Sequence, residues 1–200
     1  MSLSDPVILR VQGALLALAI EDGSDDITRE GQRQASVLMP LVKRAAGWQV
    51  ILTQRPMTMP RHPGQISFPG GRREAGESAL EAALRETHEE IGIAPSAVTT
   101  LGRLPSFNAV SEYRVTPYVG FLDPRAAIVR DQREVEEVFE VPFAFVMDGA
   151  NHITRDVFFD GRDHRLYDMP YTGADGRHRN IWGMTAMIMR RLWEKGFSDD

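Results

Sequence analysis

The segment from Ser78 to Ile91 constrains the fold more than any other stretch of the sequence. Ser78 is a suitable N-cap and Gly92 a suitable stop just past the end of a helix. Apolar or small side chains recur at helical spacing between these two residues: Leu80, Ala83, Leu84, Thr87 and Ile91. The segment therefore predicts an amphipathic helix that packs its apolar side against a larger structure.

The same segment carries three carboxylates on a separate face. At about 100° per residue, Glu86, Glu89 and Glu90 fall together, and three neighbouring carboxylates repel one another. A solvated acidic face would be the simplest explanation of such a run alone. Here, however, residues 54–77 form a long loop rich in Pro, Gly and Arg, and ordered loops of that length are usually functional. Mg²⁺ prefers oxygen ligands, so the pattern indicates a metal-assisted phosphoryl site.

The remaining pattern predicts an α/β fold with helices packed on a mixed sheet. We expect strands at 35–43, 48–53, 98–104, 114–122, 153–159 and 164–169, and a last helix at about 182–195. Residues 1–34 are expected to form an N-terminal extension, a helix followed by a mobile acidic loop. That extension would belong to the same domain as residues 35–200.

Bulk properties exclude several classes of protein. A length of 200 residues fits one domain, and a net charge of −5 disfavours binding to a nucleic-acid polymer. No cysteine is present, so disulfides and thiolate metal sites are excluded. The longest apolar run, 13–20, is far shorter than the roughly 20 residues that span a bilayer. We expect a cytoplasmic protein without a membrane partner.

The helix and the loop before it together resemble a known family. The pattern G-x5-E-x7-R-E-U-x-E-E-x-G-U of the Nudix box, in which U is an apolar residue, is matched at every fixed position. The matching residues are Gly71, Glu77, Arg85, Glu86, Glu89, Glu90 and Gly92, with Ile93 at the last apolar position. Thr87 at the first apolar position is a departure. The resemblance implies a Nudix fold, an α/β/α sandwich around a mixed β-sheet, and hydrolysis of a nucleoside diphosphate derivative.

The resemblance also implies roles for individual residues. Glu86, Glu89 and Glu90 would be the catalytic carboxylates and the ligands of Mg²⁺ or Mn²⁺, with the Gly70 carbonyl as a further ligand. Glu77 and Arg85 would form a structural ion pair. The general base could be Glu86 or Glu89.

A further acidic ligand often comes from a later loop in this family, and the stretch 134–142 carries four glutamates. Glu137 is the preferred candidate and Glu134 the second. An exposed acidic turn without a metal is the alternative reading of the same residues.

The upstream loop resembles the coenzyme A pyrophosphatase branch of the family. That branch has the pattern L-L-T-x-R-S/A-x3-R-x3-G-x3-F-P-G-G, and its counterparts here include Arg55, Gly64 and Phe68, which would contact substrate. Pro60 stands where the branch has its second arginine, and Arg61 follows one place later. Either Arg61 substitutes for it, or the contact with the substrate's 3′-phosphate is lost.

Membership of that branch would mean cleavage of CoA or acyl-CoA to 3′,5′-ADP and (acyl-)4′-phosphopantetheine. The small-molecule substrate could instead be ADP-ribose, a dinucleotide or a nucleoside triphosphate. A non-catalytic nucleotide sensor is a third reading, although such domains usually lose box glutamates. Oligomeric state stays open, with a homodimer as one option.

Overall fold

The computed structural model describes residues 4–21, 31–60, 62–109, 112–159 and 161–198. Its helices are α1 (Pro6–Glu21), α2 (Ala79–Ile91), α3 (Phe143–Val146) and α4 (Gly183–Gly196), with 3₁₀ turns at Pro95–Ala97 and Gly149–Asn151. Its strands are β1 (Arg33–Arg44), β2 (Gly47–Gln54), β3 (Ile66–Ser67), β4 (Gly70–Arg72), β5 (Val98–Arg103), β6 (Phe107–Asn108), β7 (Tyr113–Leu122), β8 (Glu137–Pro142), β9 (Ile153–Phe159), β10 (Arg162–Thr172) and β11 (His178–Trp182).

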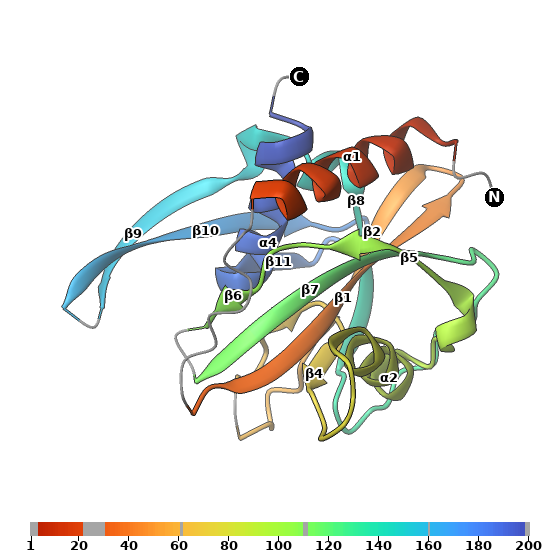
Figure 1. The fold of residues 1–200 in the computed structure, drawn as a ribbon, viewed down its shortest axis with the longest axis horizontal. Helices are drawn as coiled ribbons and strands as arrows, with labels where there is room; N and C mark the ends of the chain where they lie inside the picture. Colours follow the sequence, from red (N-terminus) through yellow and green to blue (C-terminus); the bar gives the residue numbers. More distant parts are fainter. Residues whose placement is uncertain (1–3, 22–30, 61, 110–111, 160, 199–200) are drawn as a thin grey trace.

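A large mixed sheet forms the centre of the molecule (Figure 1). Its main path runs β3-β2-β1-β7-β5, and β8 pairs with β2. Strands β1 and β7 are parallel, in register from Arg33↔Tyr113 to Leu41↔Phe121, whereas the other pairs are antiparallel. The long parallel pair needs a crossover, and the connection between its strands contains α2.

Helices cover both faces of this sheet (Figure 1). Alternate side chains of β1 point to opposite faces: Met39 and Leu41 join the core under α1 and α4, while Val42 packs with Ile91 at the end of α2. Helix α1 packs against α4 and β5. The α/β/α sandwich around a mixed sheet is therefore confirmed.

The Pro/Gly/Arg loop is tied to the sheet by two short strands. Strand β3 pairs with β2 at Thr53↔Ser67, and β4 pairs with β1 from Ala35↔Arg72 to Val37↔Gly70. The Thr185 hydroxyl at the start of α4 donates to the Ile66 carbonyl at 3.1 Å. These contacts hold the loop against the edge of the sheet, directly ahead of α2.

A second, three-stranded sheet of order β11-β10-β9 extends from the body as a long arm (Figure 1). Its inner end is attached to β8 by Arg179, whose side chain is only 5% exposed. The guanidinium lies 2.6 Å from carboxylate oxygens of both Glu137 and Asp175 and stacks on the Phe139 ring at 4.6 Å. We call this group of Arg179, Glu137 and Asp175 the arm clasp.

The structure adds strands that the sequence pattern did not predict. Residues 137–142, for which an exposed acidic turn was one expectation, form β8. Phe139 and Val141 are buried, while Glu140 is neutralised by Arg44 at 2.6 Å. Alternation of apolar and acidic residues is the strand signal that was overlooked there. In the part of the chain described, no helix is long and apolar enough to cross a membrane.

Replacing the clasp arginine should destabilise the protein markedly. In Arg179→Ala, Glu137 and Asp175 lose their buried cation, and removing one partner of a buried ion pair costs about 3 kcal/mol of unfolding free energy. Arg125 is the matched control, because it is exposed and its ion pair is with the nearby Asp123. Urea unfolding should show a large loss for Arg179→Ala and almost none for Arg125→Ala. Equal losses would contradict the role of the clasp.

Candidate active site

Helix α2 is fixed at both ends by its own sequence. The Ser78 hydroxyl accepts from the Glu81 amide while the Glu81 carboxylate accepts from the Ser78 amide, which completes a capping box. Gly92 ends the helix in a left-handed conformation, with φ of 73°. The backbone amides of Asp131 and Val129 then donate to the Glu90 and Ile91 carbonyls. The glutamates therefore stand on a rigid element.

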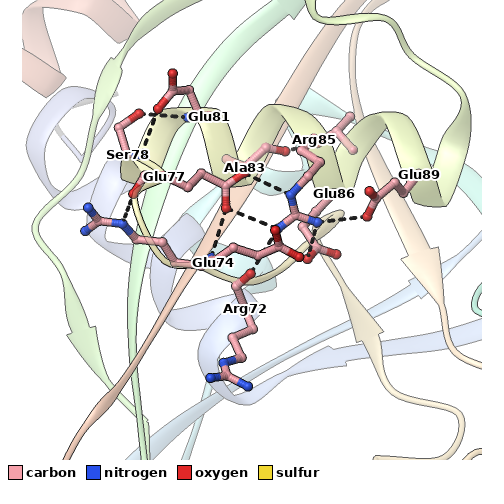
Figure 2. A network of polar contacts seen from close by, with 11 residues as sticks. Arg72, Glu74, Glu77, Ser78, Glu81, Ala83, Arg85, Glu86 and Glu89 are labelled. Atoms are coloured by element: carbon pink, nitrogen blue, oxygen red, sulfur yellow. Dashed lines mark hydrogen bonds and ion pairs between the residues drawn. The ribbon is translucent and has the colours of Figure 1, made fainter.

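Arg85 organises the surface of this helix (Figure 2). Its guanidinium donates to the Glu77 carboxylate at 2.8 and 3.2 Å and to the Arg72 carbonyl at 3.0 Å. It also donates to Glu86 at 2.9 Å and to Glu89 at 2.8 Å. The structure thus brings Glu77 and Arg85 together as an ion pair, and this pair joins the loop to the helix.

Two glycines allow the loop to approach the glutamates. A Cβ on Gly71 would lie 2.5 Å from the Glu86 carboxyl group, and a Cβ on Gly70 would lie 2.4 Å from the Ser36 carbonyl. Gly70 also has φ of 152°, where a side chain is strained. Its amide donates to the Glu90 carboxylate at 3.3 Å. The paired glycines therefore bring the backbone beside both carboxylates.

Burial changes the acidity of two of the three glutamates. Desolvation raises the pKa of Glu90 to about 8, and the neighbouring charge of Glu86 adds to this, although the Gly70 hydrogen bond opposes it. Burial likewise raises the pKa of Glu86, against the lowering effect of Arg85. Two carboxylates that are costly to ionise side by side suit a site in which a cation balances their charge.

Glu89 behaves differently from its neighbours. Its side chain is 54% exposed and turns toward Arg85. Because Arg85 draws Glu86 and Glu89 to itself, no three acidic or imidazole side chains in the described ranges are arranged as metal ligands. The three carboxylates share one side of α2, as predicted, but they do not converge on a point. Their oxygen donors, and the raised pKa values of Glu86 and Glu90, fit a hard divalent cation once Arg85 gives up Glu86 and Glu89.

The two candidates for a further acidic metal ligand, Glu137 and Glu134, have different surroundings. Glu137, the preferred one, is held in the arm clasp by Arg179 and also lies 3.0 Å from Arg177. Glu134, by contrast, is close enough for its charge to raise the pKa of both Glu86 and Glu90. The structure therefore favours Glu134 over Glu137, because two arginines already neutralise Glu137.

The substrate residues expected in the upstream loop have different positions. The positive charge of Arg55 lowers the pKa of Glu90, and its buried Nε has no hydrogen-bond partner among the described atoms. Gly64 turns the loop with φ of 67° and has no room for a Cβ beside Met57. Phe68 is 2% exposed within the main core, so in this structure its ring packs the interior rather than lining a groove. Arg61 lies outside the described residues.

Sequence reasoning overlooked Arg72. Its backbone carbonyl accepts from Arg85, and its exposed guanidinium has no ion pair or hydrogen bond within the described part of the chain. The sequence signal that could have found it is its place directly after the paired glycines. The backbone at that position passes beside α2, where the Arg72 carbonyl meets Arg85.

Comparison with known proteins places this geometry in a family. A model of the NUDIX domain matches residues 32–159. Two proteins named uncharacterized Nudix hydrolase NudL are each 40% identical to this chain. The match to the protein from Enterobacter sp. strain 638 runs over 162 residues and covers 80% of this chain and 81% of that protein. The match to the protein from Salmonella heidelberg strain SL476 runs over 169 residues and covers 83% of this chain and 85% of that protein. A solved MutT/nudix family protein from Enterococcus faecalis shares the fold, with a TM-score of 0.55, 16% identity, and coverage of 96% of this chain and 74% of that one.

The chain belongs to the Nudix family. It is a pyrophosphohydrolase that acts on a nucleoside diphosphate derivative. Nudix hydrolases generally use divalent cations such as Mg²⁺ or Mn²⁺.

The raised pKa of Glu90 predicts a pH-dependent stability of the metal-free protein. A carboxyl group with a pKa near 4.5 unfolded and about 8 folded stabilises the fold fully below pH 4.5. That contribution is lost as the pH rises through 8. In EDTA at pH 8, Glu90→Gln should therefore melt roughly 5 °C higher than the wild type. At pH 4.5 the two should melt together, and a difference independent of pH would contradict the assignment.

The close approach at Gly71 predicts a loss of activity without unfolding. In Gly71→Ala the methyl group displaces the flexible end of Glu86, which costs little stability. A misplacement of this size typically slows catalysis about 100-fold. The control is Gly13→Ala, because a methyl group there meets nothing within 4 Å. Turnover and melting temperature should be measured for both variants, and full activity in Gly71→Ala would refute the steric argument.

Proposed function

We propose that the protein hydrolyses the pyrophosphate of CoA or acyl-CoA. One water is consumed, and the products are 3′,5′-ADP and 4′-phosphopantetheine or its acylated form. Glu86, Glu89 and Glu90 would hold Mg²⁺ or Mn²⁺, with Glu134 as a further carboxylate in preference to Glu137. The substrate is a small molecule, and the reaction requires no nucleic acid or membrane.

The observation that carries the proposal is the position of Arg55 beside the buried carboxylates. Its charge acts on Glu90, and its Nε is buried without a partner. An arginine held in that way is suited to a phosphate oxygen, which it can bind with two parallel hydrogen bonds. Arg55 occupies the arginine position of the pattern that resembles the CoA branch, and Gly64 and the paired glycines occupy its glycine positions.

The positions of these residues suggest a role for each of them in the hydrolysis. Bound divalent cations would lower the pKa of water, orient the diphosphate and neutralise charge on the leaving oxygen. Glu86 would accept the proton of the attacking water at its carboxylate, because burial raises its pKa toward neutrality. Glu89 is the less suitable candidate for this role, since its side chain is exposed and bound to Arg85. Arg55 would bind the phosphate group that Glu90 and its cation face.

A second candidate keeps the same site and changes the substrate. ADP-ribose, dinucleotides and nucleoside triphosphates all carry the phosphoanhydride that such a site cleaves. The retention of Glu86, Glu89 and Glu90 argues against a sensor without turnover.

Product analysis decides between these substrates. The purified protein should be incubated with CoA, acetyl-CoA, ADP-ribose, NADH and diadenosine polyphosphates, in Mg²⁺ and in Mn²⁺. We expect the highest kcat/KM for CoA or acetyl-CoA, with release of 3′,5′-ADP detected by chromatography. A preference for ADP-ribose or a dinucleotide would reject the CoA assignment but keep the hydrolase.

A carboxylate control tests the site itself. The double variant Glu89→Gln/Glu90→Gln should lose metal-dependent turnover by at least about 1,000-fold, because neutral amides bind divalent cations weakly. Glu194→Gln in α4, where the carboxylate pairs with Arg190 and Arg191, should keep wild-type turnover. Near-wild-type rates in the double variant would exclude α2 as the metal site.

A further inference from the structure

An open cavity of about 440 Å³ lies at the edge of the sheet where β1 begins and β4 ends. Its polar lining consists of Arg33, Arg72 and Arg73, together with Gln32, Gln34 and Glu74. We call it the arginine pocket. In a chain with a net charge of −5, a surface hollow in which arginines outnumber carboxylates is a local reversal of sign. Such a reversal indicates an anionic ligand.

The strand register places two of these arginines on one face. Ala35 is paired with Arg72 across β1 and β4, so their side chains share a face of the sheet. Arg33 precedes Ala35 by two residues and therefore points to the same face. Arg33 and Arg72 are therefore diagonal neighbours on this face, and long side chains at such positions can reach one anion.

The charges around the pocket leave Arg72 available. Arg33 is bonded to Tyr113, which together with the Glu112 charge raises its pKa. Arg73 donates to the Glu77 carbonyl. The Arg72 guanidinium makes no ion pair or hydrogen bond in the described ranges, and Figure 2 shows it pointing away from α2. Among the three arginines of the pocket, Arg72 is therefore the one whose guanidinium can bind a ligand without first losing a contact described above.

The pocket adjoins the catalytic glutamates but faces away from them. Gly71 touches the Glu86 carboxyl group, and Arg72 is the next residue, so their Cα atoms are about 3.8 Å apart. Successive side chains in a strand point to opposite faces, which turns Arg72 away from Glu86. The pocket therefore adjoins the backbone that carries Gly71, on the other side of β4 from the Glu86 carboxylate.

We propose that the arginine pocket binds a phosphate monoester carried by the substrate at a distance from the bond that is cut, namely the 3′-phosphate of CoA. This inference rests on the proposed function. A phosphate monoester carries nearly two negative charges at neutral pH, and arginine binds phosphate with paired hydrogen bonds. The pocket would distinguish CoA from dephospho-CoA, which has the same diphosphate and pantetheine arm but no 3′-phosphate.

Steady-state kinetics on these two substrates test the proposal. Loss of a charge-assisted hydrogen bond should raise the KM of Arg72→Gln for CoA about 10- to 100-fold. Its kcat for CoA, and both constants for dephospho-CoA, should stay within about threefold of wild type, because Arg72 does not face the reacting phosphates. Arg72→Lys should recover part of the loss. Calorimetry in EDTA should show weaker binding of 3′,5′-ADP to Arg72→Gln and unchanged binding of 5′-AMP.

The controls separate the pocket from general electrostatics. Arg125→Gln removes one exposed arginine beyond the end of β7, away from the pocket, and should leave both substrates unaffected. If Arg72→Gln does not fold, as judged by melting, Arg33→Gln is measured instead with the same expectations.

Equal effects of Arg72→Gln on CoA and dephospho-CoA, or no effect on either, would overturn the proposed role of the arginine pocket while leaving the proposed function intact. Cleavage of neither compound by the wild type, with ADP-ribose still hydrolysed, would overturn both.

Discussion

The contacts of one guanidinium hold the active-site region together. Arg85 links the Glu77 carboxylate and the Arg72 carbonyl of the loop to Glu86 and Glu89 of α2. It stands where the acidic charge would otherwise be unbalanced, and it adds to the Gly70–Glu90 hydrogen bond and the β4–β1 pairing, which also hold the loop beside α2. The directions of the Glu86 and Glu89 side chains therefore depend on Arg85.

The same side chain would compete with a divalent cation at the proposed metal site. As the structure stands, Glu86 and Glu89 are turned toward Arg85, and burial without a metal makes ionised Glu90 costly. A bound metal ion would replace the Arg85 guanidinium as the positive charge next to Glu86 and Glu89. Arg85 thus balances much of the acidic charge without a metal, although burial still raises the pKa of both Glu86 and Glu90.

Local signals predicted much of the fold and of the site. The capped helix and strand β9 matched because capping residues and periodicity act within a few positions. The directions of the Glu86 and Glu89 side chains could not be predicted from the sequence in the same way. They depend on which of several nearby carboxylates bind Arg85. The burial of Phe68 and the clasp of Glu137 by Arg179 depend on partners far along the chain. Acidic residues on both faces of β8 concealed this strand, because Glu137 shares a face with buried Phe139 while Glu140 points to the other.

The parallel pairing of β1 with β7 governs when the active site can assemble. These strands are far apart in sequence, as their orange and green colours in Figure 1 indicate, and α2 with its loop lies between them. Closing so long a connection costs entropy that the sheet contacts must repay. The loop is held by β3 and β4, which pair with β2 and β1, so a chain that has not completed this sheet lacks the support on which the loop and the carboxylates are positioned.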